Sequence, residues 1–261
     1  MNHPRADRRA FLGALAALGL SGRIRDRPAR GDDAKPDPVG LARKVEALYA
    51  SCRAYRDSGR LVQTFRDAEG KDLVPADRKP RGLATAFVRP DKFRFEFDDD
   101  RGGKPVRNLI WMDGAAVKTW WDIRPGIEAP ESLSFALGAA AGVTESSSVT
   151  IPHLLLPKAL GRPNALSAGP GELAPLEGGA IGPHACHRLR RRFKAVNFQT
   201  GKDFEVVHTY WIDAKTSAIR RVVNEMQLEE GRSVGTMDLE PEFDAEVPAE
   251  ALAFDPPEVK P

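Results

Sequence analysis

Histidine and cysteine are the side chains in this sequence best suited to bind a transition metal, and one short run concentrates them. The run is His184-Ala185-Cys186-His187. Side chains on a β-strand alternate between its two faces, so His184 and Cys186 would share one face while His187 pointed to the other. The run therefore cannot supply three ligands to a single ion. We expect neither a metal site nor a cofactor.

An acidic run at residues 98–103 contains the oxygen ligands that calcium prefers, in the order Asp-Asp-Asp-Arg-Gly-Gly. A calcium-binding loop that began at Asp98 would need oxygen ligands at the positions that Gly102 and Leu109 occupy. A polar hairpin turn therefore fits this run better than a calcium site.

The sequence contains none of the short motifs that mark common hydrolases, nucleotide-binding proteins and zinc proteases. The patterns G-x-S-x-G, H-E-x-x-H, G-x-x-x-x-G-K-[ST] and G-x-G-x-x-G are all absent. His153, His187 and His208 are scattered and have no neighbouring nucleophile in the sequence. We expect no catalytic residue and hence no enzyme. An unrecognised hydrolase, whose catalytic groups meet only in the folded chain, is the alternative.

The N-terminal segment resembles an export signal. Arg8 and Arg9 stand just before an uncharged apolar stretch, residues 10–22. This stretch is shorter than the about 20 residues that a transmembrane helix needs, but it suits the apolar region of a signal peptide. The arginine pair followed by x-Phe-Leu resembles a twin-arginine signal. We expect a signal peptide over residues 1–31, a linker over 32–37 and a soluble protein in the periplasm or otherwise exported. A buried amphipathic N-terminal helix is the alternative.

Export changes the interpretation of the two cysteines, Cys52 and Cys186. In an oxidising compartment an even number of cysteines suggests a disulfide. A bridge over so long a loop would stabilise the fold by roughly 4–5 kcal/mol in the chain-entropy model. We therefore expect Cys52 and Cys186 to be bonded. Two free, buried thiols are the alternative.

The composition and charge are those of a globular protein with no nucleic-acid partner. Of 261 residues, 41% are hydrophobic and 29% charged, which excludes a multi-span membrane protein and a wholly disordered chain. The net charge is +2, but residues 1–31 contain seven arginines and two aspartates, so the remainder carries −3. Nucleic-acid binders need clustered basic residues. The one basic run, residues 188–194, is interpreted as a solvated strand end.

The spacing of apolar residues predicts one helix followed by antiparallel strands. Apolar residues at helical spacing predict an amphipathic helix over residues 41–49. From Tyr55 the spacing changes to a period of two, which is typical of half-buried strands. Strands are predicted at 60–65, 83–88 and 92–97, with hairpins at 109–121 and 206–226 and a last strand at 237–243.

A different segment, residues 131–160, lies between the two strand-rich halves. Its first part is apolar and rich in alanine, which predicts helix rather than strand. An apolar insert of this kind cannot stay exposed to water. We therefore expect a helical lid whose Leu133, Phe135 and Leu137 point toward the sheet face that carries the aromatic residues of strand 92–97.

Two stretches carry a resemblance to a known family. They are residues 84–97 (Ala-Thr-Ala-Phe-Val-Arg-Pro-Asp-Lys-Phe-Arg-Phe-Glu-Phe) and residues 210–221, where an aromatic-x-Asp-x-x-Thr turn joins two strands. With the order of elements over residues 38–257, they resemble the LolA-like superfamily, which includes periplasmic outer-membrane lipoprotein carriers. The resemblance implies a mainly β fold over 38–257, followed by a short tail at 258–261. It implies a curved antiparallel sheet forming an unclosed half-barrel, with an N-terminal helix, a helical lid and an apolar cavity for acyl chains.

The large apolar residues agree with such a cavity, because an aromatic sheet face must meet a second layer. An incompletely filled interface between sheet and lid is where pockets form. The residues expected to line it are Phe93, Phe95, Phe97, Trp111, Trp121, Leu133, Phe135 and Leu137. The predicted function is non-catalytic binding of lipid or lipoprotein acyl chains by a monomer. The alternative is a filled core in an envelope interaction or assembly module that binds a partner protein.

Overall fold

The computed structural model describes residues 37–74, 79–101, 104–122, 124–161, 166–196 and 201–257. The predicted signal peptide, nearly all of the predicted linker and the tail at 258–261 lie outside these residues. The elements of the fold therefore lie within residues 37–257.

The domain opens with helix α1, Pro38–Ser51. The Asp37 carboxylate caps the helix by accepting hydrogen bonds from the Val39 and Gly40 amides, at 3.1 and 3.0 Å. Pro38 suits the first turn because its missing N–H would have no partner there. One face of α1 is buried, through Leu41, Ala42, Val45 and Tyr49. The helix predicted at 41–49 is confirmed.

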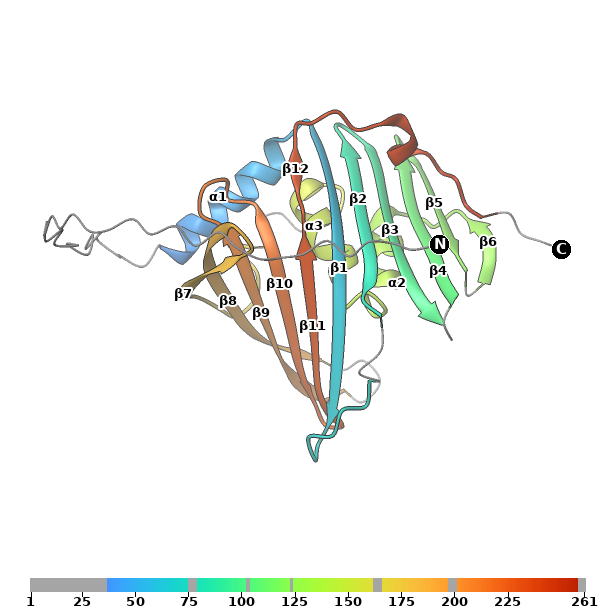
Figure 1. Cartoon of the computed structure of the whole chain (residues 1–261). Helices are drawn as coiled ribbons and strands as arrows, with labels where there is room; N and C mark the ends of the chain where they lie inside the picture. Colours follow the sequence, from blue (N-terminus) through green and yellow to red (C-terminus); the bar gives the residue numbers. More distant parts are fainter. Residues whose placement is uncertain are drawn as a thin grey trace, which may run out of the picture. The chain divides into compact units, whose positions relative to one another are not determined.

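Twelve strands of the described chain form one antiparallel sheet (Figure 1). The first six are β1 Ala54–Asp67, β2 Arg81–Val88, β3 Lys92–Arg101, β4 Lys104–Asp113, β5 Ala116–Trp121 and β6 Arg124–Glu128. The others are β7 Glu172–Ile181, β8 His184–Val196, β9 Asp203–Asp213, β10 Ile219–Leu228, β11 Gly231–Leu239 and β12 Glu242–Phe243. The predicted mainly β class and both predicted hairpins are confirmed.

The strand order is β6-β5-β4-β3-β2-β1-β11-β10-β9-β8-β7, and β12 pairs with β1. The two halves of the sheet therefore join where β1 runs antiparallel to β11, with Leu61 opposite Met237. Strands β6 and β7 are the two edges and are not paired with each other in the described residues, so the curved sheet remains an open half-barrel.

The edge strands and the last predicted strand are among the features that differ from the prediction. Strands β6 and β7 were not predicted, because Pro125 and Gly126 in β6 and Pro175 in β7 are typical of turns. Both strands are sheet edges, where proline is tolerated because no neighbour needs its N–H on one side. The last predicted strand, 237–243, is interrupted at Pro241 and splits between β11 and β12.

Two helices, α2 Leu133–Ala141 and α3 Ser147–Leu155, cover the inner face of the sheet (Figure 1). The predicted helical lid is therefore confirmed as helical. On α2 the buried residues are Leu133, Ala136, Leu137 and Ala140, a spacing of three and four residues. Phe135 is 58% exposed, so the prediction that it faces the sheet is wrong. It lies two residues from Leu133 and two from Leu137, and this offset places it on the opposite face of a helix.

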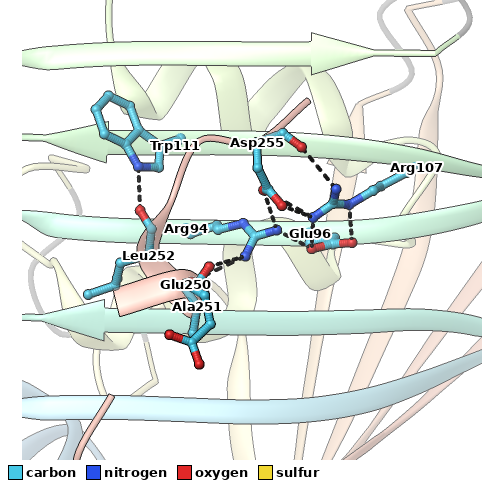
Figure 2. A network of polar contacts seen from close by, with 8 residues as sticks. All are labelled: Arg94, Glu96, Arg107, Trp111, Glu250, Ala251, Leu252 and Asp255. Carbon is cyan, nitrogen blue, oxygen red and sulfur yellow. Dashed lines mark hydrogen bonds and ion pairs between the residues drawn. The ribbon is translucent and has the colours of Figure 1, made fainter. Parts of the chain in front are cut away.

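Trp111 was also assigned to the wrong face. It stands opposite Arg94 in the β3–β4 register, whereas Phe93 and Phe95 stand opposite Met112 and Ile110. Trp111 therefore lies on the outer face, where its Nε1 donates a hydrogen bond of 2.7 Å to the carbonyl of Leu252 (Figure 2). A period of two identifies residues that share a face, but not which face turns inward.

The C-terminal segment crosses this outer face. It contains a short 3₁₀ helix, η1 Ala249–Leu252, and the following residues to Asp255. Arg94 donates to the carbonyls of Glu250 and Ala251 and pairs with Glu96 at 2.6 Å. Arg107 pairs with Glu96 and Asp255, at 2.5 and 3.1 Å (Figure 2). We call residues 249–255 the outer strap.

The expected disulfide is not formed, and both cysteines are free and buried. Cys52 belongs to the core beside α1, where its Sγ donates to the Tyr49 carbonyl at 3.1 Å. Cys186 stands opposite Asp213 on the outer-face side of β8, while the neighbouring Ile212 is in the core. The prediction failed because the even count of cysteines carries no information about which face of a sheet each one occupies.

Candidate functional site

A cavity of about 330 Å³ lies between α3 and the inner face of β8, β9 and β10. A loop that precedes β7 closes one side of it with Leu166 and Pro170. The α3 side is formed by Val149, Thr150, His153 and Leu154, after Ser146. The sheet side is formed by Arg191, Phe193, Ala195, Phe204, Val206, His208, Tyr210, Asn224 and Met226.

The wall of the cavity is apolar at one end and polar at the other. Phe204 and Val206 alternate along β9 with side chains that point outward, and Phe193 stands directly opposite Val206 on β8. Two residues further along the same strands, Arg191 stands opposite His208. Apolar side chains exclude water, and a small number of polar groups then orient a ligand.

Arg191 is the cation of the cavity, and only 3% of it is exposed. Its Nη1 donates to the carbonyls of Gly169 and Pro170, at 2.6 and 2.9 Å, and its Nη2 donates to the carbonyl of Leu166. Its Nε has no hydrogen-bond partner in the described chain. The interpretation of the run 188–194 as a solvated strand end is wrong for Arg191, because alternation must send every second residue of the run inward.

The loop that Arg191 binds is held from its other side by α1. Oε1 of Glu46 accepts hydrogen bonds from the Leu166 and Ser167 amides, at 2.9 and 2.7 Å. Its Oε2 accepts from the Ser167 hydroxyl at 2.7 Å. Both oxygens of the Glu46 carboxylate therefore bind the loop. The loop is held by Glu46 of α1 on one side and by Arg191 of β8 on the other.

His208 is neutral at pH 7. Burial, and then the charge of Arg191, lower the pKa of His208 to about 4. Its Nδ1 lies 3.1 Å from the Tyr210 hydroxyl, and burial raises the pKa of Tyr210 to about 12. At neutral pH these two groups therefore offer hydrogen bonds to the cavity but no charge.

Arg89 links the two helices that flank the cavity. Its Nε donates to the Cys52 carbonyl at 2.9 Å, just past the end of α1. Its Nη2 donates to the carbonyls of Tyr49 and Leu155, both at 3.3 Å. The last carbonyls of a helix lack partners within the helix. One guanidinium group therefore satisfies the C-terminal ends of α1 and α3 together.

The residues predicted to line a cavity lie in the other half of the sheet. Phe93, Phe95 and Phe97 are at most 2% exposed and pack in the core with Leu133 and Leu137 of α2. The half-buried Trp121 joins them, with its ring 5.9 Å from that of Phe97. None of these residues lines the cavity beneath α3. The alternation of Leu189, Arg191 and Phe193 was the sequence signal for the observed site.

Two features of the described residues bear on metal binding and on membrane insertion. They contain no group of three or more His, Cys, Asp or Glu side chains placed to hold a metal ion. None of their helices combines the length and the apolar character needed to cross a bilayer.

Comparisons with known proteins find likenesses of structure and none of sequence. No family model and no curated protein matches the sequence. The structure matches the Mycobacterium tuberculosis lipoprotein LppX with 11% identity and a TM-score of 0.44, over 82% of this chain and 99% of LppX. LprF from Mycobacterium bovis matches with 13% identity and a TM-score of 0.44, over 82% and 97% of the two chains.

A LolA superfamily protein from Nitrosomonas europaea matches with 8% identity and a TM-score of 0.36, over 84% of this chain and 98% of its own. This last protein belongs to the superfamily that the sequence also resembles, and the likeness to it is one of structure alone. At these identities and TM-scores the likeness carries no inference about ligand or activity, which must come from the cavity itself.

Proposed function

We propose that this chain is an exported, non-catalytic protein that binds an acyl chain of a lipid or lipoprotein in the cavity beneath α3. The observation that carries the proposal is the cavity of about 330 Å³ between α3 and β8–β10, with Phe193, Phe204, Val206 and Met226 in its wall. Each methylene group moved from water into such an apolar wall contributes about 0.8 kcal/mol.

The size of the cavity favours a ligand with one chain. Ligand pockets in proteins span about 300–1,000 Å³, so this cavity stands at the lower end of the range. A single acyl chain fits that space better than a lipid with several chains. The role is then that of a carrier or chaperone, which keeps one chain out of water.

Helix α3 is the element that would move to admit the chain. It has nine residues, contains Pro152, and follows Ser146, whose side chain makes no capping hydrogen bond; the Thr144 hydroxyl instead accepts one from the Ser148 amide at 3.2 Å. A short helix with an internal proline depends largely on its packing contacts for stability. Displacing α3 from the sheet therefore costs little helical structure and opens the cavity.

Two substitutions on β9 test whether the chain binds here. Val206 lines the cavity and is 5% exposed, while Val207 is the next residue and faces outward. Val206→Trp fills the space and should weaken binding of a fluorescent fatty-acyl probe by about tenfold or more, which corresponds to about 1.4 kcal/mol. Val207→Trp adds the same side chain to the other face and should leave the affinity unchanged.

The comparison is made on variants whose far-ultraviolet circular dichroism matches that of the unchanged protein. Equal probe affinity in both variants would remove the cavity from the proposed function. An unchanged protein that binds no acyl probe and co-purifies with a partner protein would contradict the carrier role and support the interaction module instead.

A further inference from the structure

The cavity contains a buried positive charge that no acidic side chain balances. No carboxylate lies within ion-pair distance of Arg191 among the residues that the structure describes. Its hydrogen bonds all go to backbone carbonyls of the loop at 166–171. Carbonyl dipoles solvate a guanidinium group but do not neutralise it, and burying an uncompensated charge is costly.

The other groups that face this cation are neutral or already engaged. His208, opposite Arg191 on β9, is neutral at pH 7, and Tyr210 keeps its proton. Glu46 is the acid on α1, and both its oxygens bind the loop backbone and Ser167. His153 faces the cavity from α3 and Asn224 from β10, and neither side chain brings a negative charge at neutral pH. An anion is the component that this end of the cavity lacks.

We propose that the cavity takes a single-chain amphiphile with an anionic head, a carboxylate or a phosphate, which pairs with Arg191 while its chain lies along Phe193, Val206 and Met226. This inference rests on the proposed function and adds the class of head group to it. Arg191 stands at the polar end of the wall, so the head binds there and the chain extends along the apolar side chains of β8–β10.

The chemistry of the guanidinium group agrees with this assignment. Charge-assisted hydrogen bonds from arginine to carboxylate or phosphate are about twice as strong as neutral ones. The Nε of Arg191 is buried and has no hydrogen-bond partner among the described residues. A neutral head such as a hydroxyl would accept one hydrogen bond there and leave the charge uncompensated.

The test compares ligands that share a chain and differ in the head. Equilibrium binding of dodecanoate, dodecyl phosphate and dodecanol is measured on the full chain, below the concentrations at which they aggregate. We expect the two anions to bind at least about tenfold more tightly than the alcohol. In Arg191→Gln this preference should disappear while the alcohol still binds. Arg190→Gln, on the outward face of the same strand, is the matched control and should keep the preference.

The ring of His208 supplies a second measurement that does not need a variant. A bound anion beside Arg191 offsets the charge that helps to lower the pKa of His208, so dodecanoate should raise that pKa in an NMR titration. Dodecanol should leave it unchanged. These two results decide the inference even if Arg191→Gln does not fold.

The outcomes separate the two proposals. Equal binding of alcohol and anions by the unchanged protein would overturn the anionic head and leave the acyl-binding function standing. Binding of inorganic phosphate as tight as that of dodecyl phosphate would overturn the amphiphile in favour of a free anion. Equal loss of all three ligands in a folded Arg191→Gln would show that Arg191 only shapes the loop. No binding of any chain would overturn both proposals.

Discussion

At the scale of single residues, the domain contains a buried carboxyl group with no cation beside it among the described residues. Asp57 accepts hydrogen bonds from the Tyr55 hydroxyl at 2.6 Å and the Thr85 amide at 2.8 Å. Burial nevertheless raises the pKa of Asp57 to about 6, because the hydrogen bonds offset only part of the cost of desolvating the carboxylate. The folded state therefore holds a proton that the unfolded state releases.

This proton predicts a particular dependence of stability on pH. Between the ordinary value of 3.8 and about 6, the folded state binds more protons than the unfolded state at Asp57. The contribution of Asp57 to stability is thus complete at low pH and is lost as the pH rises, by up to roughly 3 kcal/mol. Asp57→Asn should remove this fall in the free energy of unfolding, measured with urea from pH 4 to pH 7.

The exposed Asp203→Asn is the control and should keep the pH dependence of the unchanged protein. A variant Asp57→Asn whose unfolding free energy falls as steeply with pH as before would contradict the assignment to Asp57.

A second residue-scale prediction concerns the two faces of α2. Leu137 is fully buried, whereas Phe135 is 58% exposed. Leu137→Ala should lower the free energy of unfolding by about 2–5 kcal/mol, because it leaves a void in the core. Phe135→Ala should change it by no more than about 0.5 kcal/mol. Urea unfolding measures both. Similar losses of unfolding free energy in the two variants would mean that α2 is rotated about its axis, so that Phe135 is buried as well.

At the scale of elements, side-chain hydrogen bonds attach the helices to the sheet and to each other. The Ile219 amide donates to the Tyr49 hydroxyl at 3.1 Å and so ties α1 to β10. Arg89 joins the ends of α1 and α3. An element held by a small number of contacts opens locally at lower free energy than the sheet.

Replacing Arg89 should therefore loosen α3 in particular. Arg89→Met removes the donors while keeping much of the side-chain volume, and hydrogen bonds from charged groups are worth about 1.5–3 kcal/mol each. We expect faster amide hydrogen exchange in Ser147–Leu155 and faster uptake of the acyl probe. Arg66→Met, at an exposed ion pair with Asp72, is the control. Unchanged exchange in α3 would show that packing alone holds this helix.

At the scale of the whole domain, the two faces of the sheet pack against different parts of the chain. The inner face carries the core and the cavity, and the outer face carries the outer strap, which covers Arg94 and Trp111 (Figure 2). Lys118 lies over the rings of Trp111 and Phe254, at 5.3 and 5.5 Å, and adds to the attachment of the strap. A change on one face should therefore affect the other only through overall stability.

Removal of the outer strap tests this separation. A chain that ends at Pro248 loses the strap partners of Arg94, Arg107 and Trp111, although both arginines keep Glu96. Its free energy of unfolding should fall by at least about 1–3 kcal/mol, because buried donors lose their acceptors. Its affinity for the acyl probe, measured where the chain is fully folded, should be unchanged. Weaker binding by the folded, shortened chain would connect the strap to the cavity.

The sequence by itself determined most of the local elements and the class of the fold. Period-two spacing located β1–β5 and β9–β10, because a strand that buries one face must alternate. The alanine-rich insert predicted the helices α2 and α3, because apolar residues without alternation cannot continue a sheet. Both signals depend only on residues that are close to one another along the chain, so both can be recognised in the sequence.

The tertiary structure alone decided which faces turn inward and which strands meet. Trp111 and Phe135 are apolar in the sequence and lie outside the core, while Arg191 is charged and buried. The cavity arises because α3 packs against β8–β10, which are distant from it along the chain. Alternation tells which side chains share a face, but the direction of that face depends on pairings such as β1 with β11. Such pairings join residues that are far apart in the sequence, so no local sequence pattern predicts them.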